Sequence, residues 1–306
     1  MELIVIGSSN IDMVIYLPWI PGVGETLLGG KSRMIFGGKG ANQAIAAARS
    51  GGKISFITKL GNDIFGKNTR DHFIKEGLPS ACILSDENEP TGLAQILVSD
   101  KGENSIAVAP GANMKLSVED VTAFENDIKN AGVVLLQLEI PLETVAYAAD
   151  IAHKNGVKVI LNPAPAQALT QELLKKVWLL TPNESETELL TGIKVNDVES
   201  AALAGKALLD QGVRNVLITM GAHGSLLCNE EGQKHFGAYK ATAVDTTAAG
   251  DVFNGALAVA LTKNKSLEEA IAYGSAAAAI SVTREGAQPS IPDIDEVEQF
   301  MKASGS

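Results

Sequence analysis

The chain has 306 residues, of which 45% are hydrophobic and 5% aromatic, and its formal net charge is −11 at pH 7. This length permits one large domain with an appendage, or two domains, and an apolar content dominated by Ala, Val, Ile and Leu is typical of helices packed on a parallel sheet. The negative charge argues against a nucleic-acid partner, because proteins that bind the phosphate backbone need clustered lysine and arginine side chains.

Two further features bear on where the protein works. Cys82 and Cys228 lie far apart without CxxC spacing, so neither a zinc site nor a disulfide framework is expected, and a cytoplasmic location fits. The first seven residues, Met-Glu-Leu-Ile-Val-Ile-Gly, lack a basic leader and are predicted to form a buried strand rather than a signal peptide. The longest candidate for a membrane span, residues 275–282, is too short to cross roughly 30 Å of hydrocarbon. We therefore expect no membrane association.

Apolar runs and helical patterns alternate along the chain. Strands are predicted at residues 3–6, 54–58, 133–138, 157–161, 179–181 and 216–219. Helices, each after a turn or cap signal, are predicted at residues 41–50, 69–77, 141–155, 185–191 and 200–211. This order predicts an α/β fold with a doubly wound, mostly parallel sheet flanked by helices. In such sheets ligands bind outside the carboxyl ends of the strands.

Two regions, residues 12–36 and 91–109, break the alternation. The second resembles two strands joined by a turn that contains Lys101 and Gly102. We expect a small β-sheet that covers the strand ends as a lid, or that offers an edge for dimerisation. The edge is also compatible with a monomer, because Lys31, Arg33 and Lys101 could blunt it. Residues 1–306 are thus interpreted as a single α/β domain with this lid.

Several glycine motifs do not define a nucleotide site. Residues 61–68 match GxxxxGK but end in Asn where a P-loop needs a Ser or Thr hydroxyl for magnesium, so we expect them only to begin a helix. Residues 38–43, Gly-Lys-Gly-Ala-Asn-Gln, have Gln at the third glycine position of a dinucleotide fingerprint, which disfavours a dehydrogenase. Neither His-Arg-Asp nor Asp-Phe-Gly occurs, which excludes a protein kinase on its own signature.

Polar residues after the predicted strands suit a polyol ligand. Asn10 and Asp12 follow the first strand, and an amide and a carboxylate so close together can grip neighbouring hydroxyls. The loop from Gly37 to Asn42 adds close backbone approach, an amine and another amide, and Glu139 follows the strand at 133–138 as a further acceptor. Each residue taken alone is more often a cap or turn residue.

Asp251 closes the segment Val244-Asp-Thr-Thr-Ala-Ala-Gly-Asp251, in which small residues lead into a helical pattern. Ala248, Ala249 and Gly250 leave their backbone N–H groups open to an anion at a helix start, where the macrodipole is positive. A carboxylate at the end of this turn is a candidate base beside a transferring group. Alternatively, Asp251 only caps the helix that begins at Val252.

Two long motifs in the same order resemble the ribokinase family of carbohydrate kinases, also called the PfkB family. Gly-Gly-Lys-Gly-Ala-Asn-Gln-Ala, residues 37–44, is similar to the family's first signature, and Asp-Thr-Thr-Ala-Ala-Gly-Asp-Val-Phe-Asn-Gly, residues 245–255, to its second. The resemblance covers nearly the whole chain. It implies a ribokinase-like fold and ATP-dependent phosphorylation of D-ribose at the 5-hydroxyl.

The resemblance also implies roles for individual residues. Asp251 would be the base, and the amides of Ala248, Ala249 and Gly250 would stabilise charge on the transferring phosphoryl group. The sugar-binding residues implied are Asn10, Asp12, Gly38, Lys39, Asn42, Glu139 and Asp251. Those implied for ATP are Asn183, Thr219, Gly221, Gly224, Gly250 and Ser275, although relatives often carry Asn at the position of Ser275.

Two cations are implied in the same way. Asn183 and Glu186 match a family motif that organises Mg²⁺ and phosphate, with Glu186 acting through water. An activating K⁺ would be held by Asp245, Thr247, Ser281, Arg284, Gly286 and Ser290, several of them through backbone carbonyls. The resemblance further implies a homodimer through the β-lid.

Alternatives remain open on the sequence alone. A kinase of the same family could act on 2-deoxyribose, a ketohexose or a nucleoside. A non-catalytic sugar or nucleotide sensor could have kept the fold, but a pure binder has no need of Asp251 as a base. A dehydrogenase ranks third because its fingerprint is absent.

Overall fold

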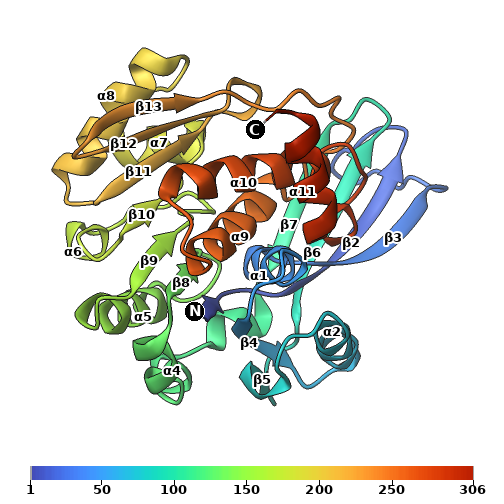
Figure 1. Ribbon diagram of the computed structural model, residues 1–306. Coiled ribbons are helices and arrows are strands. Elements are labelled where there is room, and N and C mark those ends of the chain that lie inside the picture. The colour runs from blue at the N-terminus through green and yellow to red at the C-terminus, as the bar shows by residue number, and fades with distance from the viewer. Residues whose placement is uncertain (1, 306) are drawn as a thin grey trace.

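Two β-sheets organise the structure, a computed structural model that describes residues 2–305 (Figure 1). Within that range the larger sheet has nine strands. Their order from edge to edge is β13 (Gly232–Phe236), β12 (Ser225–Asn229), β11 (Asn215–Thr219), β10 (Leu179–Leu180), β9 (Lys158–Leu161), β8 (Val133–Leu136), β1 (Leu3–Ile6), β4 (Ile54–Gly61) and β5 (Ile83–Asp86). In this sheet β11, β10, β9, β8, β1, β4 and β5 run parallel, and only the pairings of β12 with β11 and β13 are antiparallel. The predicted doubly wound, mostly parallel sheet is confirmed.

Helices cover both faces of this sheet because its central strands are apolar on both sides. Along β1, Leu3 and Val5 point into one core and Ile4 and Ile6 into the other, as the two-residue period of a strand requires. The helices that contribute to the first core are α1 (Lys39–Arg49), α2 (Ile64–Lys75), α9 (Ala249–Thr262), α10 (Leu267–Ser281) and α11 (Ile294–Ala303). Those packed in the second are α3 (Val118–Thr122), α4 (Glu125–Asn130), α5 (Leu142–Lys154), α6 (Gln171–Leu174), α7 (Glu184–Thr191) and α8 (Val198–Asp210). Four short 3₁₀ helices complete the described chain: η1 (Ser80–Cys82), η2 (Gly111–Lys115), η3 (Gly221–His223) and η4 (Gln288–Ser290).

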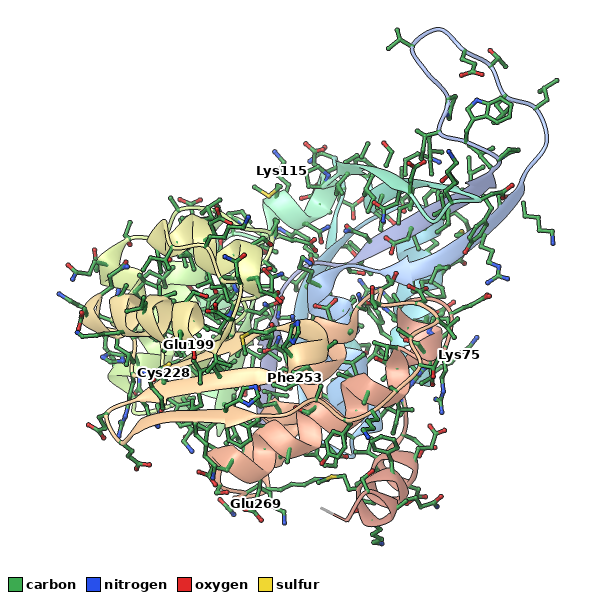
Figure 2. All side chains as sticks on the ribbon, turned by 90° about the horizontal axis from the view of Figure 1, so that it is seen from above. Lys75, Lys115, Glu199, Cys228, Phe253 and Glu269 are labelled. Atoms are coloured by element: carbon green, nitrogen blue, oxygen red, sulfur yellow. The ribbon has the colours of Figure 1, made fainter. Side chains whose placement is uncertain are left out.

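The second sheet is formed by the two regions that break the α/β alternation. Its order is β3 (Lys31–Gly37), β2 (Asn10–Leu17), β6 (Gly92–Ser99) and β7 (Asn104–Ala109), with β2 and β6 parallel and the other pairs antiparallel. The hairpin turns at Lys101 and Gly102, as predicted. Figure 2 shows the loop that joins β2 to β3 extending well beyond the main body. A small sheet separate from the α/β body is therefore confirmed.

Some boundaries differ from the prediction. Helix α2 begins at Ile64 rather than at residue 69, because the Asp63 side chain accepts a hydrogen bond from the Gly66 amide and caps it. The GxxxxGK-like segment thus begins a helix, as expected. The hairpin of β12 and β13 was not predicted, since β13 is almost wholly exposed and lacks an alternating apolar pattern.

The helix that begins near Asp251 starts earlier than the capping hypothesis requires. Helix α9 begins at Ala249 after Ala248, whose backbone is left-handed with φ of 60°. Asp251 therefore lies inside the first turn, and the hypothesis that it caps the helix is wrong. No helix in residues 2–305 combines the length and apolarity needed to span a bilayer.

Helices α1 and α9 approach closely, and this contact positions the site described below. A Cβ atom at Gly255 in α9 would collide with the Gln43 carbonyl oxygen in α1 and press on the Cβ of Ala46. Only glycine lets the two backbones meet here.

We predict that Gly255→Ala lowers the free energy of unfolding by about 1–3 kcal/mol, because the added methyl group overpacks a contact with rigid backbone. Denaturant unfolding measures the change. Gly237→Ala is the matched control, because a Cβ at Gly237 meets no atom within 4 Å. Equal stability of Gly255→Ala and the control would contradict the close-packing argument.

Candidate active site

The predicted polar residues converge around one lysine at the carboxyl ends of neighbouring strands. Lys39 is the first residue of α1, and four carboxylates act on its ammonium group: Asp251, Glu139, Glu186 and Asp12. Burial opposes the charge of Lys39, but the four acids outweigh that cost and raise its pKa. Lys39 therefore stays protonated and supplies the positive charge of the site.

Asp251 is buried, with 6% of its surface exposed, and is held by two side-chain amides. Asn42 Nδ2 donates to Asp251 Oδ2 at 3.0 Å and Gln43 Nε2 donates to Oδ1 at 2.9 Å. Burial raises the pKa of Asp251, while Lys39 and the two donors favour the ionised form. The result is a fixed carboxylate that can accept a proton, which suits a general base.

A layer of buried amides behind Asp251 was not predicted. Gln43 Nε2 also donates to Asn162 Oδ1 at 3.0 Å, and Gln43 Oε1 accepts from Gln137 Nε2 at 2.6 Å. Gln288 Nε2 in turn donates to Asn42 Oδ1 at 3.2 Å. These contacts orient the two amides that hold Asp251. The sequence did carry one signal for them, because Gln43 belongs to the first signature. Its side chain was considered only as the departure from a dinucleotide fingerprint.

Glu139 has a structural contact as well as its predicted place near the sugar. Its Oε2 accepts from the Ser8 hydroxyl at 2.5 Å and from the Lys39 amide at 3.0 Å. The next two amides of α1 donate to the hydroxyl and the carbonyl of Ser8. One oxygen of Glu139 therefore satisfies the start of α1, and a ligand would use the other.

Asn10 and Asp12 lie on the same face of β2, because successive side chains of a strand alternate. Asn10 Oδ1 accepts from Asn113 Nδ2 at 2.7 Å. Burial raises the pKa of Asp12 to about 7, and the nearby charges of Glu139 and Asp251 add to this rise. Asp12 thus titrates near neutral pH rather than in the usual acidic range.

The residues predicted for ATP line a single cavity of about 600 Å³ between the start of α9, α10 and the turn after β11. They are Asn183, Thr219, Gly221, Gly224, Gly250 and Ser275. Phe253, Ala278, Ala279 and Val282 give the cavity an apolar wall that suits a planar base. The cavity reaches Gly250, so it ends beside the next residue, Asp251.

In the turn before α9, one of the three amides predicted to bind an anion already has a partner within the turn. Asn254 Nδ2 donates to the Gly250 carbonyl at 2.8 Å and braces the first turn. The Ala249 amide donates to the Thr246 carbonyl at 3.2 Å, so it is engaged within the turn. Gly250 is exposed and lies at the helix start, where an anion is favoured.

Asn183 and Glu186 form a capping box at the start of α7. The Asn183 amide and Nδ2 donate to the two oxygens of Glu186 at 2.9 and 3.0 Å, and Asn183 Oδ1 accepts from the Glu186 amide at 2.8 Å. Burial raises the pKa of Glu186. Within residues 2–305, no three His, Cys, Asp or Glu side chains gather as a metal site. The residues thus fit Mg²⁺ held through water and phosphate but not in a protein cage.

The residues predicted for K⁺ come from two segments that meet. Asp245 Oδ2 accepts from the Gly286 amide at 2.8 Å, and Asp245 Oδ1 accepts from the Thr247 amide at 2.9 Å. The Arg284 guanidinium is paired with Glu296, so only its carbonyl could face a cation. Ser281 and Ser290 donate their hydroxyls to the carbonyls of Ala278 and Ala287. Asp245 therefore joins the two segments named in the K⁺ prediction.

His223 is exposed on η3 and lies apart from the carboxylates that surround Lys39. Its backbone carbonyl oxygen lies 2.8 Å from Nε2 of His235, and Gly221 and Gly224 on either side of it line the nucleotide cavity.

Known proteins similar to this chain share its whole length. The family model described as pfkB family carbohydrate kinase matches residues 1–294. A ribokinase of Haemophilus influenzae is 47% identical over 98% of both chains, and a deoxyribokinase of Salmonella typhi is 37% identical over 98% of this chain and 99% of the relative. The structure of Arabidopsis thaliana ribokinase complexed with ribose and ATP superposes with a TM-score of 0.92 at 36% identity, covering 98% of each chain.

A second solved structure, ribokinase from Thermotoga maritima, gives a TM-score of 0.91 at 42% identity and covers 98% of this chain and 99% of the other. Both structures have the same α/β body with the same added sheet, as the coverage requires. With the two signatures placed around Asp251 and Lys39, the chain belongs to the pfkB family of carbohydrate kinases.

Proposed function

We propose that this chain is an ATP-dependent kinase that phosphorylates D-ribose at its 5-hydroxyl and releases D-ribose 5-phosphate and ADP. The observation that carries the proposal is the position of Asp251. Its buried carboxylate accepts from Asn42 and interacts electrostatically with Lys39 and Asp12, while the preceding residue, Gly250, lines the cavity. A sugar hydroxyl that contacts Asp251 would therefore face the end of a nucleotide in that cavity.

The chemistry follows from this arrangement. Asp251 accepts the proton of the 5-hydroxyl as the oxygen attacks the γ-phosphoryl group, and ADP leaves in line with the attack. The start of α9 offers backbone N–H groups to the phosphoryl oxygens. Lys39, half-buried and charged, balances negative charge beside the reacting centre.

The cations enter the proposal through the residues that could hold them. Glu186 and Asn183 would bind Mg²⁺ through water, and the metal would neutralise charge on the phosphate oxygens. The segments around Asp245 and Gly286 would hold K⁺ through carbonyls. Asp245 Oδ2 ties these segments together, and Asp245 lies six residues before Asp251 in the chain. A cation there would therefore stiffen the start of α9.

Assembly and location are part of the same proposal. Ile106 and Val108 on β7 are 55% and 53% exposed, and an apolar face of this kind supports a homodimer formed through the small sheet. The small sheet would also act as the lid over the sugar. Cys82 and Cys228 are buried free thiols, which supports a cytoplasmic site of action.

The activity is tested by ADP release from Mg-ATP with D-ribose, 2-deoxyribose, fructose and adenosine, each with and without potassium. We expect turnover with ribose and stimulation by potassium. 2-Deoxyribose is the competitor that matters most, because a deoxyribokinase is among the relatives. Turnover with another sugar alone would keep the mechanism and change the substrate, whereas sugar binding without turnover would indicate a sensor.

Removal of the base tests the mechanism. We predict that Asp251→Asn lowers kcat by about 10²–10⁴-fold, because the amide cannot accept the hydroxyl proton, while ribose binding measured by calorimetry is largely retained. Asp295→Asn, a change to an exposed acid on α11, is the control and should leave kcat unchanged. Near-normal turnover of Asp251→Asn would refute the role of Asp251.

The raised pKa of Asp12 predicts a pH-dependent effect on stability. Between the ordinary value of 3.8 and about 7, the folded chain holds a proton on Asp12 that the unfolded chain has lost, so this residue makes stability fall as pH rises through that window. Asp12→Asn removes the effect. We expect the Tm of Asp12→Asn to increase relative to the wild-type Tm as the pH is raised from 5 to 8.

Thermal unfolding at pH 5, 6, 7 and 8 gives the comparison. Asp100→Asn, at an exposed aspartate in the small sheet's hairpin turn, is the matched control. A Tm difference for Asp12→Asn that does not change with pH would contradict the assigned titration.

A further inference from the structure

Asn113 connects the small sheet to the sugar-binding strand. It lies on η2, directly after β7 returns to the main body, and only 2% of its surface is exposed. Its Oδ1 accepts from the Ser9 amide at 2.8 Å. Its Nδ2 donates to the Ser9 carbonyl at 3.0 Å and to Asn10 Oδ1 at 2.7 Å.

These contacts fix which way each amide points. A backbone N–H can only donate and a backbone carbonyl can only accept, so Ser9 allows one orientation of the Asn113 amide. The Nδ2 of Asn113 then faces Asn10, which must offer its oxygen. The NH₂ group of Asn10 consequently remains for a ligand.

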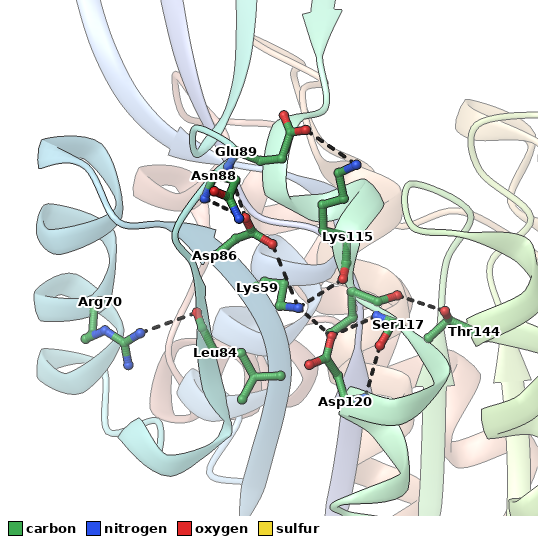
Figure 3. A network of polar contacts seen from close by, with 11 residues as sticks. Lys59, Arg70, Leu84, Asp86, Asn88, Glu89, Lys115, Ser117, Asp120 and Thr144 are labelled. Carbon is green, nitrogen blue, oxygen red and sulfur yellow. Dashed lines mark hydrogen bonds and ion pairs between the residues drawn. The ribbon is translucent and has the colours of Figure 1, made fainter.

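Two features hold Asn113 in place. A Cβ atom at Gly92 would collide with both Asn10 Oδ1 and Asn113 Nδ2, so the glycine at the start of β6 makes room for their hydrogen bond. The end of η2 is anchored by a hydrogen bond and an ion pair (Figure 3). Lys59 Nζ on β4 donates to the Lys115 carbonyl at 3.0 Å, and Lys115 Nζ pairs with Glu89 Oε1 at 3.4 Å.

The orientation matters because of what lies two residues along β2. A sugar hydroxyl has one proton and can also accept. With the NH₂ of Asn10 on one side and an acceptor oxygen of the Asp12 carboxyl group on the other, it can accept from the first and donate to the second. If Asn10 were turned over, two acceptors would compete for one proton, and one would be left without a partner.

We propose that Asn113 is a positioning residue for sugar recognition, which fixes the NH₂ group of Asn10 toward the sugar so that Asn10 donates while Asp12 accepts. The proposal rests on the proposed sugar kinase function and names the residue that sets its hydrogen-bond polarity. Asn113 acts through Asn10 and does not itself take part in phosphoryl transfer.

The first test is Asn113→Asp. The carboxylate still accepts from the Ser9 amide, but it cannot donate to Asn10, which would turn its own NH₂ toward residue 113. We expect the ribose Kd from calorimetry without ATP, and the ribose KM, to rise at least about tenfold. The kcat at saturating ribose and the KM for ATP should change by less than about twofold, because neither Asp251 nor the nucleotide cavity is touched.

The second variant, Gly92→Ala, breaks the same hydrogen bond from the other side and should give the same rise in ribose Kd. It also serves if Asn113→Asp does not fold. Met114→Ala, at a 46% exposed neighbour on η2, is the matched control and should behave as wild type. Tm values show whether each variant is folded.

A folded Asn113→Asp or Gly92→Ala variant with an unchanged ribose Kd would overturn the proposal. A fall in kcat with an unchanged ribose Kd would also overturn it, because that result marks a merely structural role. Wild-type chain that binds ribose without turnover refutes the kinase function but leaves this inference to be decided by the binding data. Wild-type chain that binds no sugar refutes both.

Discussion

The arrangement of the site depends on one buried carboxyl group, Asp251, whose charged form needs hydrogen-bond donors inside the protein. A buried charge without partners is costly, so its hydrogen-bond donors must be in place before any ligand arrives. Asn42 and Gln43 supply them from α1, and they reach Asp251 because α1 and α9 meet at Gly255. The close packing of two helices therefore positions the proposed base, and the apolar core that holds the helices together supports this geometry.

Charge balance explains the rest of the site. Four carboxylates act on a single ammonium group, that of Lys39. A site with such a surplus of acid either retains protons, as Asp12 does near neutral pH, or takes up cations. A bound triphosphate would add negative charge to the same region, which favours the cations proposed at Glu186 and around Asp245.

Much of the fold could be predicted from the sequence because buried parallel strands are short apolar runs between capped helices. The boundaries at Leu3–Ile6 were read directly, whereas β13 was missed because it is exposed and has no apolar period. The residues proposed as the base and as part of the sugar site, Asp251, Lys39 and Asn42, could be predicted because two signatures mark them. Asn113 and Gln137 could not be found in this way. They are ordinary polar residues whose partners lie far away in sequence, Ser9 and Gln43, and only the folded chain brings them together. Glu139 itself was predicted, but its hydrogen bond to the start of α1 joins residues 100 apart in the sequence and was not.

The ion pairs at the foot of the small sheet have a mechanical consequence. Lys59 and Lys115 tie together the two ends of the hairpin formed by β6 and β7, one end before Gly92 and the other after Ala109. Because β6 is also paired with β2 along its length, the hairpin would move together with the small sheet, least near Asn113 and most toward Lys101. The amides of Asn10 and Asn113 lie at this anchored end. If the small sheet moves as the proposed lid, the amides proposed to recognise the sugar would therefore be displaced least.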